Sequence, residues 1–311
     1  MFVRSGLILA PLLAVAACKS DGNKPPLYTE ASKTPERAPG EAVTEVAEEP
    51  PPSASERDLW FARGDGREAI LARERGDHEA ATQLLDRLLA RDDLSADDRG
   101  AAELLRGLED VEAGAHARAA DRFAAARKAP ALAKLDARLR LLEAQARLDA
   151  GDPARALELT EGLAGGPQEA DLLLIRADAS QRTNARAEAI ALYEQLLASA
   201  SSHPRRHEAR AKLAGLLAQA GEGDAPLSPE ARAELTKARA LYETLELEVP
   251  LSDYAAEAAA ALPRIDARLG ARSKADALAF ERSLAKSRIE DELKRGRYKA
   301  VIQDVDALLK G

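Results

Sequence analysis

A short pattern recurs along most of the chain and constrains its fold more than any other feature. A glycine is followed after five residues by an alanine and after nine by an apolar or aromatic residue, as in Gly114, Ala119 and Phe123. Glycine accepts the left-handed backbone that ends one helix and lets the chain reverse. A small residue five positions later lets the second helix approach the first closely. The pattern therefore predicts helical hairpins.

Six copies of this pattern can be read along the chain. Asparagine replaces the glycine of the fourth copy, and a longer loop at 221–229 replaces that of the fifth. The first four turns lie about 33 to 38 residues apart, a spacing typical of stacked hairpins. The residues expected to form the turns and packed faces are Gly76, Ala81, Gly114, Ala119, Phe123, Gly151, Ala156, Asn184, Ala189, Tyr193, Ala238, Tyr242 and Gly296.

The order of glycine, alanine, aromatic residue and proline resembles that of the tetratricopeptide repeat family. Prolines expected to end the second helices are Pro130, Pro167, Pro204 and Pro250. The tryptophan–leucine–glycine–tyrosine signature of the family's first helix is missing. The resemblance covers roughly residues 59–309 and implies an all-α fold, a right-handed superhelical solenoid of stacked helical hairpins at 57–311. The alternative is an irregular helical bundle in which the glycine spacing is accidental.

The N-terminal residues have the anatomy of a secretory signal. Arg4 precedes an apolar run at 7–17 that is too short to span a bilayer as a permanent helix. The sequence Val15-Ala16-Ala17-Cys18 resembles the lipobox of bacterial lipoproteins. That resemblance implies that residues 1–17 are removed and that Cys18 is acylated and inserted into a membrane. An inert thiol inside an ordinary signal peptide is the alternative.

Residues 18–56 are predicted to form a disordered linker behind this anchor. They contain seven prolines and a run of glutamates but few large apolar residues. In lipoproteins an aspartate after the cysteine favours the inner membrane, whereas this chain has Lys19. We therefore expect the protein at the periplasmic face of the outer membrane.

Composition limits the classes of partner. The formal net charge is -8 at pH 7, which argues against a general affinity for nucleic acid or anionic lipid head groups. Aromatic residues make up only 3% of the chain, as in helical repeat proteins rather than β-rich ones. No glycine-rich phosphate loop or serine–histidine–aspartate order is present, so we expect no cofactor.

Several segments, among them 150–159, 178–193 and 296–309, resemble the superhelical N-terminal region of lytic murein transglycosylases. In that family the region surrounds or positions peptidoglycan. Catalysis there uses a glutamate followed by serine, and no Glu-Ser dipeptide occurs in this sequence. The chain therefore has no expected catalytic residue, and it belongs to an enzyme only if a lysozyme-like domain follows Gly311.

Three functions stay open at this point. The chain is a tethered scaffold that binds envelope proteins or peptidoglycan, the N-terminal part of a lytic transglycosylase, or a lipoprotein of an outer-membrane assembly or secretion complex. We favour the first hypothesis, because the repeats lack a recognisable set of catalytic residues.

Four histidines and two acidic clusters are the remaining candidates for a metal-binding or catalytic site. His203 and His207 are expected at a solvated helix start rather than at a metal site, because no third ligand is spaced nearby. His78 and His116 are expected to pack between helices.

The acidic clusters are Glu103, Glu109, Asp110 and Glu112, and Glu290, Asp291 and Glu292. Carboxylates on a charged helix usually face water, so both clusters are expected to be solvated. Trp60 and Phe61 are expected to cap the first hairpin.

Overall fold

The computed structural model describes residues 64–163, 168–200, 202–223 and 225–310, with side chains up to residue 305. The chain divides into two units, Met1–Pro51 and Pro52–Gly311, and every described residue belongs to the second. The predictions for the signal peptide, Cys18, the linker, Trp60, Phe61 and Pro167 therefore lie outside the described residues.

Every regular element in these described ranges is a helix, which confirms the all-α prediction. The α-helices are α2 (Gly64–Glu74), α3 (His78–Leu89), α4 (Ala96–Glu112), α5 (His116–Ala126), α6 (Asp136–Asp149), α7 (Pro153–Thr160), α8 (Glu169–Arg182), α9 (Arg186–Ser199), α10 (Arg206–Ala218), α11 (Pro229–Glu248), α12 (Asp253–Leu269), α13 (Lys274–Lys294) and α14 (Tyr298–Lys310). Two short 3₁₀ helices, η2 (Pro130–Leu135) and η3 (Gln219–Gly221), lie in connections. None of these described helices is long and apolar enough to cross a bilayer.

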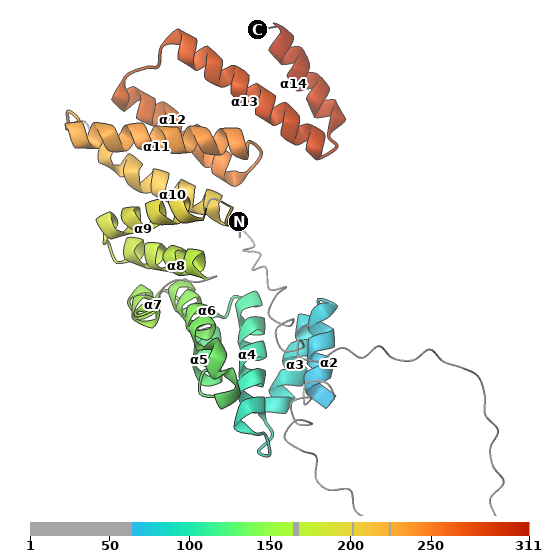
Figure 1. The fold of residues 1–311 in the computed structure, drawn as a ribbon. Coiled ribbons are helices and arrows are strands. Elements are labelled where there is room, and N and C mark those ends of the chain that lie inside the picture. Colours follow the sequence, from blue (N-terminus) through green and yellow to red (C-terminus); the bar gives the residue numbers. More distant parts are fainter. Residues whose placement is uncertain (1–63, 164–167, 201, 224, 311) are drawn as a thin grey trace, which may run out of the picture. The chain divides into compact units, whose positions relative to one another are not determined.

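Helices that follow each other in sequence also pack against each other (Figure 1). This holds for every step from α2 to α12. Additional contacts join α6 to α8 and α10 to α12, which are next-but-one neighbours. A helix is thus buried between the helices that precede and follow it, and the core runs along the chain instead of forming around one centre.

Five of the tight turns share one backbone geometry. Gly76, Gly114, Gly151 and Gly296 have φ between 70° and 89°, and Asn184 has φ 60°. In each turn the next residue donates its N–H to the carbonyl five residues earlier, as in Asp77 to Ala72 at 2.9 Å. This is the bond of a Schellman motif, which satisfies carbonyls left free at the helix end.

The alanine at the start of the second helix is fully buried in each of the first five copies of the pattern, whereas Val301 of the sixth is half-buried. Ala81, Ala119, Ala156, Ala189 and Ala238 each have 0% exposure. The aromatic residues four positions later, Phe123, Tyr193 and Tyr242, are also buried. The second helix of each hairpin therefore presents this face to its neighbours.

A second set of small residues lies on the first helices, seven positions before the turn. Ala69, Gly107, Ala144 and Ala177 all occupy this position and all are buried. A Cβ on Gly107 would lie 2.7 Å from Cε1 of Phe123, closer than two carbon atoms approach without movement. Small residues on both helices therefore permit the close packing of a hairpin, and the sequence pattern predicted only those on the second helices.

The six-copy pattern is interrupted before its last copy. Helix α12 follows the fifth copy, but the next helix, α13, begins after a loop at Gly270 with φ 99° and not after a turn of the repeated type. Helix α13 packs against α11 and α14. The sequence pattern did not predict α12, because the pattern consists only of the turns and of positions on the second helices.

Candidate functional site

A pocket of about 760 Å³ lies among α8, α10, α11 and α12. Ala211, Leu216, Leu235, Ala261 and Ile265 supply its apolar lining. Gly215 also lines the pocket, where a Cβ would make an ordinary contact of 3.6 Å with the Tyr242 hydroxyl oxygen. Pockets that combine an apolar lining with a few polar groups are the usual ligand sites of proteins.

One wall of the pocket is held by a buried carboxylate, Asp178 of α8. Its side chain is 6% exposed and accepts a hydrogen bond from the Tyr193 hydroxyl of α9. Lys212 of α10 places Nζ 2.6 Å from Oδ2 of Asp178. Burial, reinforced by the negative charge of Asp178, raises the pKa of Tyr193, so the phenol stays protonated and donates. Three helices are thereby joined through one carboxylate.

Glu208 extends this charged wall into the pocket. Arg205 donates from Nε and Nη2 to the two carboxylate oxygens of Glu208 at 2.7 and 2.9 Å, and Lys212 lies 2.7 Å away. Burial disfavours the charge of Glu208, but the bonds from Arg205 and the charge of Lys212 outweigh it and lower its pKa to about 2. Glu208 therefore stays ionised across the physiological range.

The remaining polar groups of the pocket are less constrained. The Tyr242 hydroxyl donates to Oε1 of Glu257 at 3.3 Å, and burial raises the pKa of Tyr242. Glu257 and Arg264 are exposed, and Tyr254 is half-buried. On α10 the charged groups of the pocket are held by ion pairs. On α12 the exposed Glu257 and Arg264 provide one negative and one positive group.

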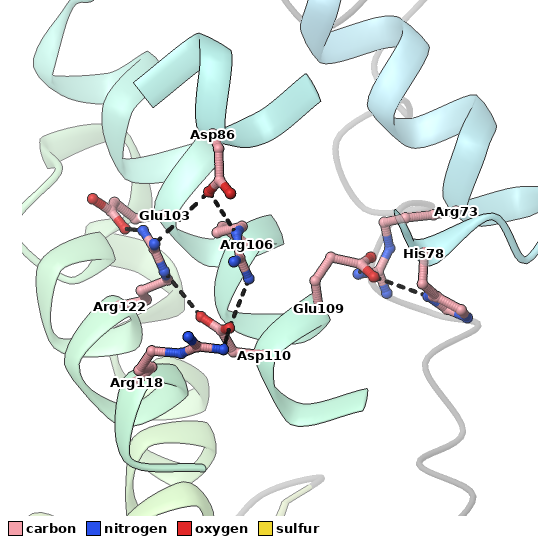
Figure 2. A network of polar contacts seen from close by, with 9 residues as sticks. All are labelled: Arg73, His78, Asp86, Glu103, Arg106, Glu109, Asp110, Arg118 and Arg122. Atoms are coloured by element: carbon pink, nitrogen blue, oxygen red, sulfur yellow. Dashed lines mark hydrogen bonds and ion pairs between the residues drawn. The ribbon is translucent and has the colours of Figure 1, made fainter. Parts of the chain in front are cut away.

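A second charged cluster connects the first two hairpins (Figure 2). Asp110 of α4 is fully buried and meets three arginines. Arg122 donates from Nε to Oδ2 at 3.0 Å, while Arg106 and Arg118 reach Oδ1 as ion pairs at 2.7 and 3.1 Å. Arg106 also contacts Asp86 of α3 at 2.7 Å. The cluster ties α3, α4 and α5 together.

Its neighbour Glu109 faces the other side of α4 and is 2% exposed. Arg73 of α2 forms an ion pair with Glu109, and Nδ1 of His78 lies 2.9 Å from its Oε2 (Figure 2). The prediction that His78 packs between helices is wrong, since its side chain is 51% exposed and makes this polar contact. His116 is half-buried, and its Nδ1 has no hydrogen-bond partner among the described residues.

The prediction that the first acidic cluster is solvated is therefore wrong for Glu109 and Asp110. Glu109 and Asp110 are buried because arginines on α2, on α5 and on α4 itself neutralise them, a condition that allows a charge inside a protein. In the second cluster Glu292 is buried beside Arg297, at 3.3 Å, whereas Glu290 is exposed as expected.

His203 and His207 are also less exposed than predicted. Their side chains are 15% and 13% exposed, and each faces a carboxylate: Asp171 at 3.3 Å and Glu248 at 3.6 Å. Burial and the charge of Arg206 lower the pKa of His207. In the described ranges no group of three or more potential ligands among His, Cys, Asp and Glu lies close enough to hold a metal ion.

Of the residues that line the pocket, the sequence pattern predicted only Tyr242, and that as a packing residue. One local signal was available. Asp178 lies within the run 172–180, whose other members, Arg176 apart, are apolar or small. A carboxylate in such a run needs a partner, and its partners come from α9 and α10.

The comparisons with known proteins add no family. A scan against models of protein families finds no match, and a search of curated proteins finds no significant relative. The site is therefore interpreted from its own geometry.

Replacing Asp110 by alanine should destabilise the protein strongly, because three arginines would then face each other around a buried cavity. We expect the free energy of unfolding to fall by about 3 to 5 kcal/mol, measured by urea denaturation. Asp121→Ala is the matched control, since Asp121 forms an ion pair with Arg147 but is 73% exposed. It should cost about 0 to 1 kcal/mol. Equal effects of the two substitutions would show that the buried cluster is not stabilising.

Glu208 predicts a specific dependence of stability on pH. The pKa of Glu208 in the folded state is about 2, below the ordinary 4.5. Its contribution to the free energy of unfolding is therefore fully present above pH 4.5 and is lost as the pH falls toward 2. Glu208→Gln should lower the free energy of unfolding at pH 7 by on the order of 3 kcal/mol, and this difference should shrink between pH 5 and 2. Glu188→Gln, at an exposed position of α9, is the control. A constant difference across this pH range would contradict the assignment.

Proposed function

We propose that the protein is a lipid-anchored scaffold of the periplasmic face of the outer membrane, which binds envelope proteins or peptidoglycan in cell-envelope maintenance. The pocket among α8, α10, α11 and α12 is the observation that carries the binding role. The sequence around Cys18 is the support for the anchor and for the location.

We propose further that the helices form a superhelical solenoid, and the order in which they pack supports this. Consecutive helices in contact from α2 to α12, with repeated left-handed turns, are what a tetratricopeptide-like superhelical solenoid would require. Each hairpin then leaves a similar surface available, and the pocket lies on the part of that surface that α8, α10, α11 and α12 form.

Within this proposal a polypeptide segment fits the pocket better than a glycan chain. Sugar rings usually stack on exposed aromatic faces, and Tyr242 is only 3% exposed with its hydroxyl already bonded. An extended segment, in contrast, could use the apolar floor and place side chains of either charge against Arg264 or Glu257. We therefore favour a protein partner.

Site-specific photo-crosslinking in cells tests anchor and binding together. A photoreactive amino acid replaces Arg264, which lines the pocket and is exposed, in the full chain. We expect a discrete crosslinked protein in the membrane fraction. Cys18→Ser in the same background should reduce the membrane-bound fraction several-fold, because the acyl chains are lost.

The same photoreactive residue at Lys134, an exposed position that does not line the pocket, is the control. Identical adducts from positions 264 and 134 would refute binding at the pocket. Persistence of the Cys18→Ser protein in the membrane fraction would refute the lipid anchor, whatever the crosslinks show.

A further inference from the structure

The exposed apolar residues of the described chain gather in its last two helices. The large hydrophobic side chains with high exposure there are Leu278 and Leu293 of α13 and Tyr298 and Ile302 of α14, at 45%, 47%, 67% and 62%. Three of the four lie within ten residues around the turn at Gly296 that joins α13 to α14 (Figure 1). Soluble proteins seldom leave such residues clustered without a partner.

Cations alternate with these residues in the same turn. The segment 293–303 contains Lys294, Arg295, Arg297 and Lys299 and no acidic residue, and all four cations are exposed. Arg295 and Arg297 form ion pairs with Asp291 and Glu292, which precede the segment. Lys294 and Lys299 form no ion pair with any described side chain.

We propose that this surface, Leu293 to Ile302, contacts an anionic phospholipid membrane. Tyrosine prefers the boundary between head groups and acyl chains, and lysine and arginine reach the phosphates beside it. Leu293 and Ile302 supply the apolar part that enters the boundary. A lipid surface accepts the cations at its phosphates and the exposed Tyr298 and Ile302 at its acyl boundary, so the combination favours the lipid surface over a purely acidic partner.

The net charge of -8 does not exclude this contact. Charge acts locally, since its influence in solution decays over about 8 to 10 Å at physiological ionic strength. The negative charge of the whole chain predicts repulsion from anionic lipid only for surfaces that have the same average charge. At the turn at Gly296 four exposed cations lie between acidic residues at 290–292 and 304, and Lys294 and Lys299, which pair with no described carboxylate, would hold the C-terminal hairpin at the membrane.

The cellular setting of this contact rests on the proposed lipid anchor, which would supply a high local concentration of membrane and strengthen an otherwise weak interaction. The test is independent of the anchor. It uses the chain from Lys19 onward, without Cys18, and measures co-sedimentation with vesicles at millimolar lipid and low salt. Vesicles of phosphatidylcholine with and without 30% phosphatidylglycerol are compared.

We expect binding to the anionic vesicles only, and loss of this binding in high salt. Lys294→Gln with Lys299→Gln should lower the partition coefficient by on the order of tenfold to thirtyfold, since each lysine near an anionic surface contributes about fivefold. Neither lysine has an ion partner among the described side chains, so the fold should be unaffected. The matched control is Lys128→Gln with Lys134→Gln, an equal change of charge at exposed positions of the same unit.

A second variant, Tyr298→Ser with Ile302→Ser, should also weaken binding while circular dichroism stays unchanged. The proposal is overturned if the chain binds neither vesicle, if it binds both equally, or if the control pair has the same effect as the test pair. It is also overturned if a peptide of the acidic residues 41–56 displaces the chain completely at charge-equivalent concentration, because the turn then binds the linker. None of these outcomes depends on acylation of Cys18.

Discussion

The close approach of paired helices is the constraint on which the rest of the structure depends. It requires a small residue on each helix: one seven positions before the turn, such as Gly107, and one five positions after it, such as Ala119. A larger aromatic residue then fills the space between them, as Phe123 does. Because consecutive helices from α2 to α12 pack against one another, stability there comes from neighbours along the chain and not from one central core.

This packing also fixes the charged groups. Tyr193 occupies the same position in its copy as Phe123, but its hydroxyl donates to Asp178, the carboxylate that also binds the pocket-lining Lys212, so one residue serves the apolar face and the support of the pocket. Asp110 is buried in the same way between α4 and α5, where arginines from both helices surround it. The carboxylates can be buried because helical packing brings cations from separate helices to one point.

The sequence predicted local features well and features between helices poorly. The turns at Gly76 and Asn184 and the buried Ala189 follow from residue size and backbone preference, which are local properties. The burial of Asp110 was missed, because its partner Arg122 lies on the next helix and exposure was inferred from the acidic run alone. The pocket could not be predicted, since it depends on how α8, α10, α11 and α12 are placed relative to one another.

A double-mutant cycle at Gly107 and Phe123 tests the packing account most directly. A Cβ at position 107 would collide with the Phe123 ring, so Gly107→Ala should lower the free energy of unfolding by about 1 to 3 kcal/mol despite alanine's higher helix propensity. In a Phe123→Leu background the same substitution should be neutral or stabilising by up to about 1 kcal/mol. An equal effect of Gly107→Ala in both backgrounds would contradict the account.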